Sequence, residues 1–215
     1  MQTTDSSSPR VPRLRAWLST SDTPCTADLI FVLAGRVHRK VYGLELLRQG
    51  LAPRILFSVG RFEIRRFSKM PLPVSLDLLK IAQEVPPPQR HYFVCFQGQE
   101  VRVEHVLPGR FGTLTEIAAL ARWLDANPEV RSVIVISSAS HLRRIRMCCR
   151  SLLKGNPKLV FLAAPLDTPH PPPAGAPDAQ VEHTLSEEGG LTPTLKGDLW
   201  ELFKLAIYWA LLKFR

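Results

Sequence analysis

Short apolar runs alternate with amphipathic stretches through most of the chain. The apolar runs, each short enough for one buried strand of a parallel sheet, are residues 28–33, 54–59, 131–138 and 158–163. The amphipathic stretches, with apolar residues at three- and four-residue spacing, are residues 39–49, 72–83, 113–127 and 141–154. Strands that alternate with helices predict an α/β fold, a Rossmann-like three-layer sandwich with a mostly parallel sheet.

Two further strands are expected in the middle of the chain. Residues 91–96 and 100–106 flank the tripeptide Gln97-Gly98-Gln99, and they form either a hairpin or two separate strands. Residues 28–60 have the order strand, helix, strand, which predicts a βαβ unit with a right-handed crossover.

The two ends of the chain differ from this pattern. Residues 1–26 are rich in Ser, Thr and Pro and are expected to form a flexible tail, so that residues 27–215 form a single domain. Residues 165–194 are rich in Pro and Gly, which predicts a long loop. Residues 195–215 form a closing helix, apolar around most of its circumference. We expect it to pack on the sheet as a core helix, and peripheral contact with a membrane is the alternative.

The composition narrows the classes of partner. The net charge is +9, which favours small anionic ligands, nucleic acid or anionic lipid alike. We find no reading helix typical of a sequence-specific DNA-binding module and no apolar segment of 18 residues, and we expect no leader peptide. The four cysteines have neither zinc-site nor disulfide-framework spacing, so we expect no metal site and a reducing, cytoplasmic location with membrane association as an option. No pattern predicts an oligomeric state.

In a parallel sheet, ligands bind beyond the carboxyl ends of the strands. The first such end contains Gly35, which lets a ligand approach the backbone, and Arg39, which opens the next helix and could hold an anion. The motif is neither a dinucleotide fingerprint nor a P-loop. A tight turn with a solvated arginine is the alternative.

The richest segment follows the strand at residues 131–138. Here Ser137 and Ser138 lead into a helix that begins with His141 and carries Arg144 in its first turn. These groups could bind a phosphate or carboxylate, and His141 could transfer a proton near neutral pH. A helix start capped by Ser138 or Ser140, with a surface histidine, is the alternative.

A carboxylate stands at the start of another predicted helix. Thr113 is the expected N-cap and Glu116 follows three residues later, which is a capping-box pattern. Glu116 could also bind a ribose hydroxyl or an amine, or act as a base. A basic stripe, defined as Arg143, Arg146, Arg150 and Lys154, is typical of a solvated helix face, and contact with a nucleic-acid backbone is the alternative.

Together these motifs resemble the YdcF/SanA/ElyC family, the domain of unknown function numbered 218. The family's opening turn and helix correspond here to Leu33, Gly35, Arg39, Gly43, Leu47 and Gly50. Its second strand end is similar to Ser58-Val59-Gly60, and its acidic helix start is similar to the segment from Thr113 to Ala118. Its most specific signature aligns without gaps on the segment from Ile136 to Ile145, which contains His141 and Arg144. Its closing helix resembles Glu201, Lys204 and Tyr208.

The resemblance implies a Rossmann-like domain whose biochemistry is poorly defined. One family member is linked to S-adenosylmethionine binding, and others to the bacterial cell envelope and peptidoglycan. It implies a ligand site made of Gly35, Arg39, Ser58, Gly60, Thr113, Ser137, Ser138 and Arg144, with His141 and Glu116 as the catalytic pair. The leading hypothesis is therefore a site for a nucleotide-like or phosphorylated ligand. A non-catalytic basic module that binds nucleic acid or a protein partner of the envelope is the alternative.

Overall fold

The structure is a computed structural model that describes residues 20–107, 109, 112–153, 155, 157–166 and 195–213. Most of the expected flexible tail and most of the expected Pro/Gly-rich loop lie outside these residues. The end of the expected tail is not loose, because Asp22 N donates to the carbonyl of Phe161 over 2.8 Å and Asp22 Oδ2 accepts from Phe161 N over 2.8 Å. Residues 20–26 therefore belong to the domain.

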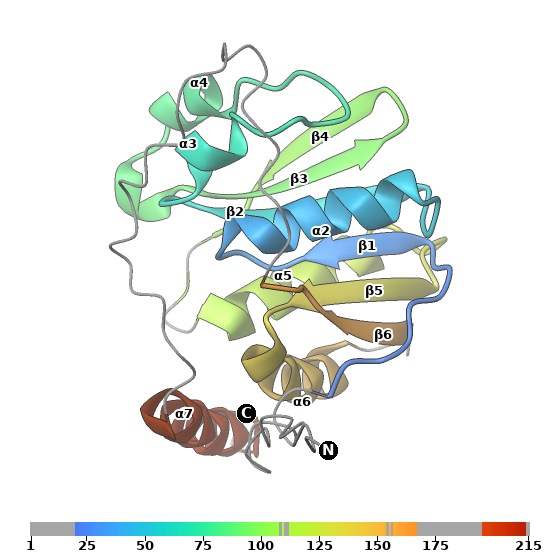
Figure 1. The fold of residues 1–215 in the computed structure, drawn as a ribbon. Helices are drawn as coiled ribbons and strands as arrows, with labels where there is room; N and C mark the ends of the chain where they lie inside the picture. The colour runs from blue at the N-terminus through green and yellow to red at the C-terminus, as the bar shows by residue number, and fades with distance from the viewer. Residues whose placement is uncertain are drawn as a thin grey trace, which may run out of the picture.

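A six-stranded mixed sheet forms the centre of the molecule (Figure 1). The strands are β1 (Leu29–Val32), β2 (Arg54–Gly60), β3 (His91–Gln97), β4 (Glu100–His105), β5 (Ser132–Ser137) and β6 (Lys158–Ala163), in the order β4-β3-β2-β1-β5-β6. Strands β2, β1, β5 and β6 are parallel, and β3 runs antiparallel to both β2 and β4. The predicted α/β sandwich is confirmed, and the open choice between hairpin and separate strands resolves to a β3–β4 hairpin.

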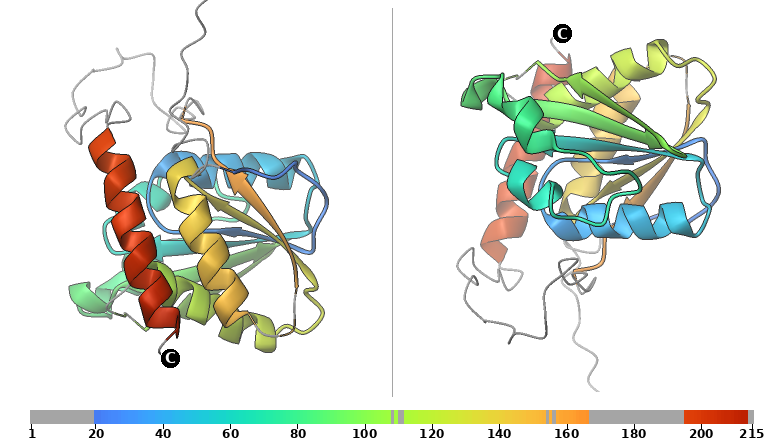
Figure 2. Two further views of the ribbon diagram at one scale, coloured as in Figure 1. Left: turned by 90° about the horizontal axis from the view of Figure 1, so that it is seen from below. Right: turned by 90° about the horizontal axis from the view of Figure 1, so that it is seen from above.

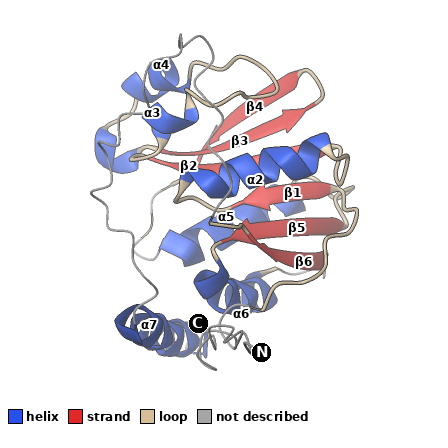
Figure 3. Cartoon of the chain, viewed as in Figure 1, coloured by secondary structure: helices blue, strands red, loops and turns tan. Residues whose placement is uncertain are grey.

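Helices cover both faces of the sheet (Figures 1 and 3). The helices are α2 (Val37–Arg48), α3 (Ile64–Phe67), α4 (Leu78–Gln83), α5 (Gly112–Asp125), α6 (Leu142–Leu152) and α7 (Leu195–Lys213), with short 3-10 turns η1 (Pro87–Gln89) and η2 (Ala139–His141). Helices α2, α3 and α4 cover one face, and α5 and α6 cover the other. Alternate residues of β1 supply the two cores, Leu29 and Phe31 on the α5–α6 side, Ile30 and Val32 on the other.

The helix expected over residues 72–83 begins only at Leu78. Pro73 disfavours the helical conformation of Leu72, the first residue of the expected helix, because a proline restricts the residue before it. Asp77 then caps the helix, since its side chain accepts from Lys80 N over 3.1 Å. The single turn α3 was not predicted from the sequence.

The closing helix α7 lies outside the sandwich, so the expectation that it packs on the sheet is wrong. It packs against α6 and η2, side by side with α6 (Figure 2). Tyr208 is buried there and Leu212 is partly buried, while Trp200, Phe203 and Trp209 are exposed. Helices already cover both faces of the sheet, which leaves α7 a place in an outer layer. Among the described residues, no helix combines the length and apolarity needed to cross a membrane.

Candidate functional site

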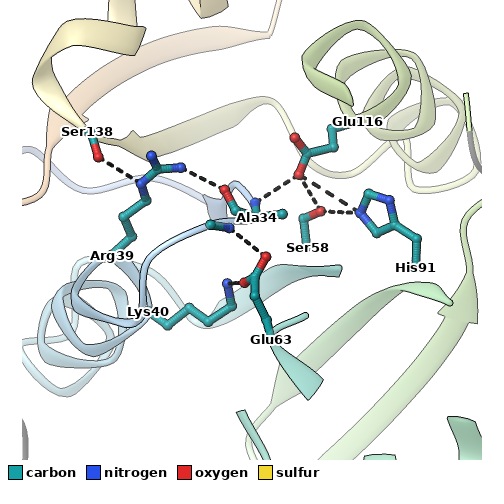
Figure 4. Close-up of polar contacts among 9 residues, drawn as sticks. Ala34, Arg39, Lys40, Ser58, Glu63, His91, Glu116 and Ser138 are labelled. Atoms are coloured by element: carbon teal, nitrogen blue, oxygen red, sulfur yellow. Dashed lines mark hydrogen bonds and ion pairs between the residues drawn. The ribbon is translucent and has the colours of Figure 1, made fainter. Parts of the chain in front are cut away.

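The carboxyl ends of β1, β2 and β5 and the amino end of β3 meet at one edge of the sheet. The strand order reverses between β1 and β5, because the chain leaves β1 toward β2 and later returns to β5 on the other side. A crevice at such a reversal is where open α/β sheets bind ligands. Ala34 follows β1 and Ser138 follows β5 at this edge (Figure 4), and Gly35 comes directly after Ala34 in the chain; these residues mark the candidate site.

Arg39 joins the two sides of this reversal. Its Nη1 donates to the carbonyl of Ala34 over 2.6 Å, its Nε donates to Ser138 Oγ over 3.0 Å, and its Nη2 lies 3.1 Å from Nδ1 of His141. The side chain is only 5% exposed, so the alternative of a solvated arginine is wrong. Gly35 makes room for it, because a Cβ there would lie 2.8 Å from Nη1 of Arg39 and the backbone φ is +131°.

His141 is held as a neutral imidazole. Nδ1 accepts from Arg39, which leaves the proton on Nε2, 3.5 Å from Oε1 of Glu201. Burial first, and then the positive charges of Arg39, Arg144, Lys204 and Arg36, lower the pKa of His141 to about 3. The expected proton transfer by His141 near neutral pH is therefore not supported. Burial and the neighbouring arginines together keep this imidazole uncharged.

The expected serine cap at this helix start is also wrong. No side chain caps η2 or α6, and Ser138 Oγ accepts from Arg39 instead of from a helix amide. Ser137 ends β5 with no exposed surface, and its hydroxyl has no hydrogen-bond partner among the described residues. Arg144 forms a buried ion pair with Glu201 and lies over the ring of Tyr208. The carboxylate of Glu201 thus takes the place that a ligand anion was expected to have beside Arg144.

Glu116 does not form the expected capping box. Helix α5 begins one residue before Thr113, and Thr113 bonds to Tyr208 of α7 rather than acting as the N-cap. The Glu116 carboxylate turns toward the sheet, where Oε1 accepts from Ala34 N over 2.8 Å and from Ser58 Oγ over 2.5 Å. The Ala34 amide and the buried Ser58 hydroxyl thus bind the Glu116 carboxylate, which in a capping box would accept from an amide at the start of the helix.

His91 completes this part of the site, and the sequence reasoning missed it. Its Nε2 lies 2.7 Å from Ser58 Oγ (Figure 4). Because the Ser58 hydroxyl donates its only proton to Glu116, it must accept from Nε2–H of His91, and Nδ1 then carries the lone pair. Burial lowers the pKa of His91, an effect that the charges of Glu116 and Glu63 partly offset. Glu116, Ser58 and His91 therefore form a chain that fixes one tautomer of the histidine.

A second buried pair, also missed, supports the same turn. Lys40 is 1% exposed and forms an ion pair with Glu63, whose Oε1 accepts from Gly35 N over 2.6 Å. Burial lowers the pKa of Lys40, and the negative charge of Glu63 opposes that shift. Gly60, at the end of β2, accepts a hydrogen bond from Glu63 N over 2.9 Å. Consecutive amides of Ala34 and Gly35 thus each bind one carboxylate.

The site has two chemically different sides. Arg39 and Arg36 lie near His141 at the β5 side, although the charges of Glu116 and Glu63 also act on Arg39. Acceptors gather at the β2–β3 side: among the described residues, neither Oε2 of Glu116 nor Nδ1 of His91 has a hydrogen-bond partner. The part of the chain that the structure describes contains no cluster of side chains suited to a metal ion. Such an arrangement can orient a ligand that carries both an anionic group and a hydroxyl.

The chain was compared with protein-family models, curated proteins and solved structures, and no match was found.

Proposed function

We propose that the crevice between β1 and β5 binds a small nucleotide-like or phosphorylated ligand. The observation that carries the proposal is the position of Arg39, which is buried, spans the reversal of strand order and contacts both Ser138 and His141. An anion beside this guanidinium would gain a charge-assisted contact in a partly desolvated place. The exposed Arg36 adds a second positive charge at the mouth of the site.

The acceptor side supports the choice of ligand class. A ribose or sugar hydroxyl could donate to Oε2 of Glu116, and a neighbouring hydroxyl could donate to Nδ1 of His91. This nitrogen could also accept a proton from a substrate, since Ser58 holds the other nitrogen protonated. In this proposal His91, rather than His141, carries any acid–base chemistry, and Glu116 is a positioning residue and hydroxyl acceptor.

The family assignment belongs to the same proposal. We infer that the chain is a divergent member of the YdcF/SanA/ElyC family, because the residues that carry the resemblance include Arg39, Ser58, Glu116 and His141, which meet at this edge. S-adenosylmethionine, which the resemblance suggests, has a carboxylate for the cationic side and ribose hydroxyls for the acceptor side. A role in envelope or peptidoglycan metabolism rests on the resemblance alone. A reducing, cytoplasmic location is supported by four free cysteines, three of them buried.

A thermal-shift panel tests the proposal. It contains S-adenosylmethionine, its demethylated product, nucleotides, sugar phosphates and peptidoglycan precursors, each added to the full chain. A ligand at about a hundred times its Kd stabilises the fold by about 2.7 kcal/mol, which for this size corresponds to roughly 5–10 °C. A shift of this size with a phosphorylated or nucleoside ligand is expected, and no shift across the panel would overturn the proposal.

Two substitutions locate the binding. Arg36→Gln removes an exposed charge at the cationic side and should reduce the shift, whereas Arg48→Gln, at the exposed far end of the same helix, should leave it unchanged. Glu116→Gln should weaken the binding of ligands that contain a free hydroxyl pair more than it weakens the binding of inorganic phosphate. Equal shifts in Arg36→Gln and Arg48→Gln would place the binding elsewhere.

The nucleic-acid alternative receives less support from the described contacts. In the basic stripe, Arg146 is already bound to Asp22 Oδ1 over 2.6 Å and to the carbonyl of Thr20, and its guanidinium lies over Phe161. Steep salt dependence of DNA binding that disappears on Arg150→Ala would favour that alternative.

A further inference from the structure

A groove separate from the crevice runs between α6 and α7. The two helices lie side by side at the outer margin of the molecule (Figure 2), and the space between them amounts to about 900 Å³. Cavities of about 300–1,000 Å³ are typical of small-molecule sites. The segment with Thr20 and Asp22 closes one part of the groove.

The two walls of the groove differ in chemistry. The α6 wall is cationic, because Arg143, Arg146 and Arg150 recur at three- and four-residue spacing along its outer face. The α7 wall is apolar, with Leu202, Leu205 and Trp209 among its residues. Trp209 is 56% exposed although it lines the groove, so apolar surface there still faces water. Exposed apolar surface that is rimmed by polar or charged residues marks an interaction surface or a ligand-binding groove.

The cations of the groove differ in whether a carboxylate already binds them. Arg146 is satisfied by Asp22, but Arg150 is exposed and makes no ion pair among the described residues. Lys213, in the last turn of α7, also lines the groove, and its Nζ lies 4.9 Å from the ring centroid of Trp209. An anionic group between Arg150 and Lys213 would therefore meet two cations without displacing a carboxylate.

We infer that this groove binds a single-chain anionic amphiphile, such as an alkyl phosphate or a long-chain carboxylate. The head group lies at Arg150 and Lys213, and the chain extends along the wall formed by Leu202 and Leu205. A small hydrophilic anion would leave the apolar wall in contact with water, and a neutral chain would bring no anionic group to Arg150 and Lys213. The inference does not depend on the function proposed for the crevice, because no residue is shared between the two sites.

Calorimetric titration of the full chain with decyl phosphate, below the concentration at which it forms micelles, tests the inference. Binding should strengthen about three- to fourfold for each added methylene, as expected for a chain that enters an apolar site. Inorganic phosphate and decanol, which carry the head or the chain alone, should bind much more weakly. Arg150→Gln should weaken the binding of decyl phosphate about two- to fivefold, which corresponds to the contribution of an exposed ion pair. Arg48→Gln should leave this binding unchanged.

A matched pair of substitutions on α7 decides whether the groove is the site. Ala206→Trp fills the groove, since Ala206 lines it, whereas Ala210→Trp adds the same ring on the same helix outside the lining. Loss of decyl phosphate binding in the first variant alone, with both variants folded by circular dichroism, is the expected result. Equal binding by both variants would overturn the inference. Binding to anionic vesicles with none to monomeric decyl phosphate would overturn it too, in favour of docking on a bilayer surface.

Discussion

Ser58 Oγ lies 2.5 Å from Oε1 of Glu116 and 2.7 Å from Nε2 of His91, so one buried hydroxyl connects a carboxylate to an imidazole. The order differs from a serine–histidine–acid triad, in which the histidine stands between the other two groups. Ser58 has no exposed surface, so it cannot be the attacking nucleophile in this arrangement. Its role is to fix the tautomer of His91. This role can be tested by measuring the stability of a Ser58 variant and the pKa of His91 in that variant.

Ser58→Ala should destabilise the fold by about 1–3 kcal/mol, because it leaves buried polar groups of Glu116 and His91 without their partner. Ser137→Ala is the matched control. Its hydroxyl is equally buried at the end of a neighbouring strand, but it has no partner among the described residues, so its loss should be neutral or stabilising. Urea denaturation measures both. Equal effects of the two substitutions would contradict the hydrogen-bonded chain.

The low pKa of His141 should make stability depend on pH. The unfolded chain takes up a proton on this residue near pH 6.5, whereas the folded protein holds its pKa near 3. Between these values the unfolded state binds more protons, so the free energy of unfolding falls as pH falls, by at most about 1.4 kcal/mol per unit. The stabilising contribution is therefore present above pH 6.5 and is lost toward pH 3.

Urea denaturation at pH 7.5 and pH 5 measures this dependence. The difference between the two pH values should be up to about 2 kcal/mol smaller in His141→Gln than in the parent chain. His105→Gln, at an exposed histidine, is the control and should keep the parent dependence. An unchanged dependence in His141→Gln would show that this histidine titrates normally.

The strands could be predicted to within one residue at each end, because short apolar runs bounded by turn residues are typical of buried strands. The rule that ligand groups follow parallel strand ends also brought together Arg39, Ser138 and His141 correctly. Their roles could not be predicted in the same way. Whether an arginine faces solvent or bonds across a sheet depends on the neighbouring strand, which the local pattern does not specify.

His91 and Glu63 could not be found from the sequence for a related reason. His91 reaches the carboxyl edge of the sheet because β3 runs antiparallel to β2, and the sequence left that pairing open. Glu63 reaches Gly35 from a short turn with no clear periodicity. The position of α7 was missed because a helix that is apolar all round indicates burial without indicating which element covers it.

The buried ion pair between Arg144 and Glu201 should hold α7 to α6. Glu201→Gln leaves a buried guanidinium without its charge partner, which should cost about 3–5 kcal/mol. The matched control is Glu129→Gln, which removes an exposed carboxylate from Arg54 and should cost at most about 1 kcal/mol. Urea denaturation measures both substitutions. A Glu201→Gln variant as stable as Glu129→Gln would mean that α7 docks through its apolar contacts alone.

Gly43 sets the distance between α2 and the sheet, and with it the position of Arg39 one turn earlier on the same helix. A Cβ at residue 43 would lie 2.7 Å from Cγ2 of Val32 and 3.2 Å from Cδ1 of Ile55. Val32 is a buried, β-branched strand residue, so it cannot move aside cheaply. Gly43→Ala should therefore destabilise the fold by about 1–3 kcal/mol, the usual cost of overpacking.

Gly112→Ala provides the comparison, since no atom lies within 4 Å of a Cβ built there and alanine favours a helix. It should be neutral or slightly stabilising in thermal denaturation. Because Arg39 moves with α2, Gly43→Ala should also weaken the binding of any ligand whose binding Arg36→Gln weakens. Gly112→Ala should leave that binding unchanged. A Gly43→Ala variant with the stability and ligand affinity of the parent would show that α2 can shift outward without disturbing the contacts of Arg39.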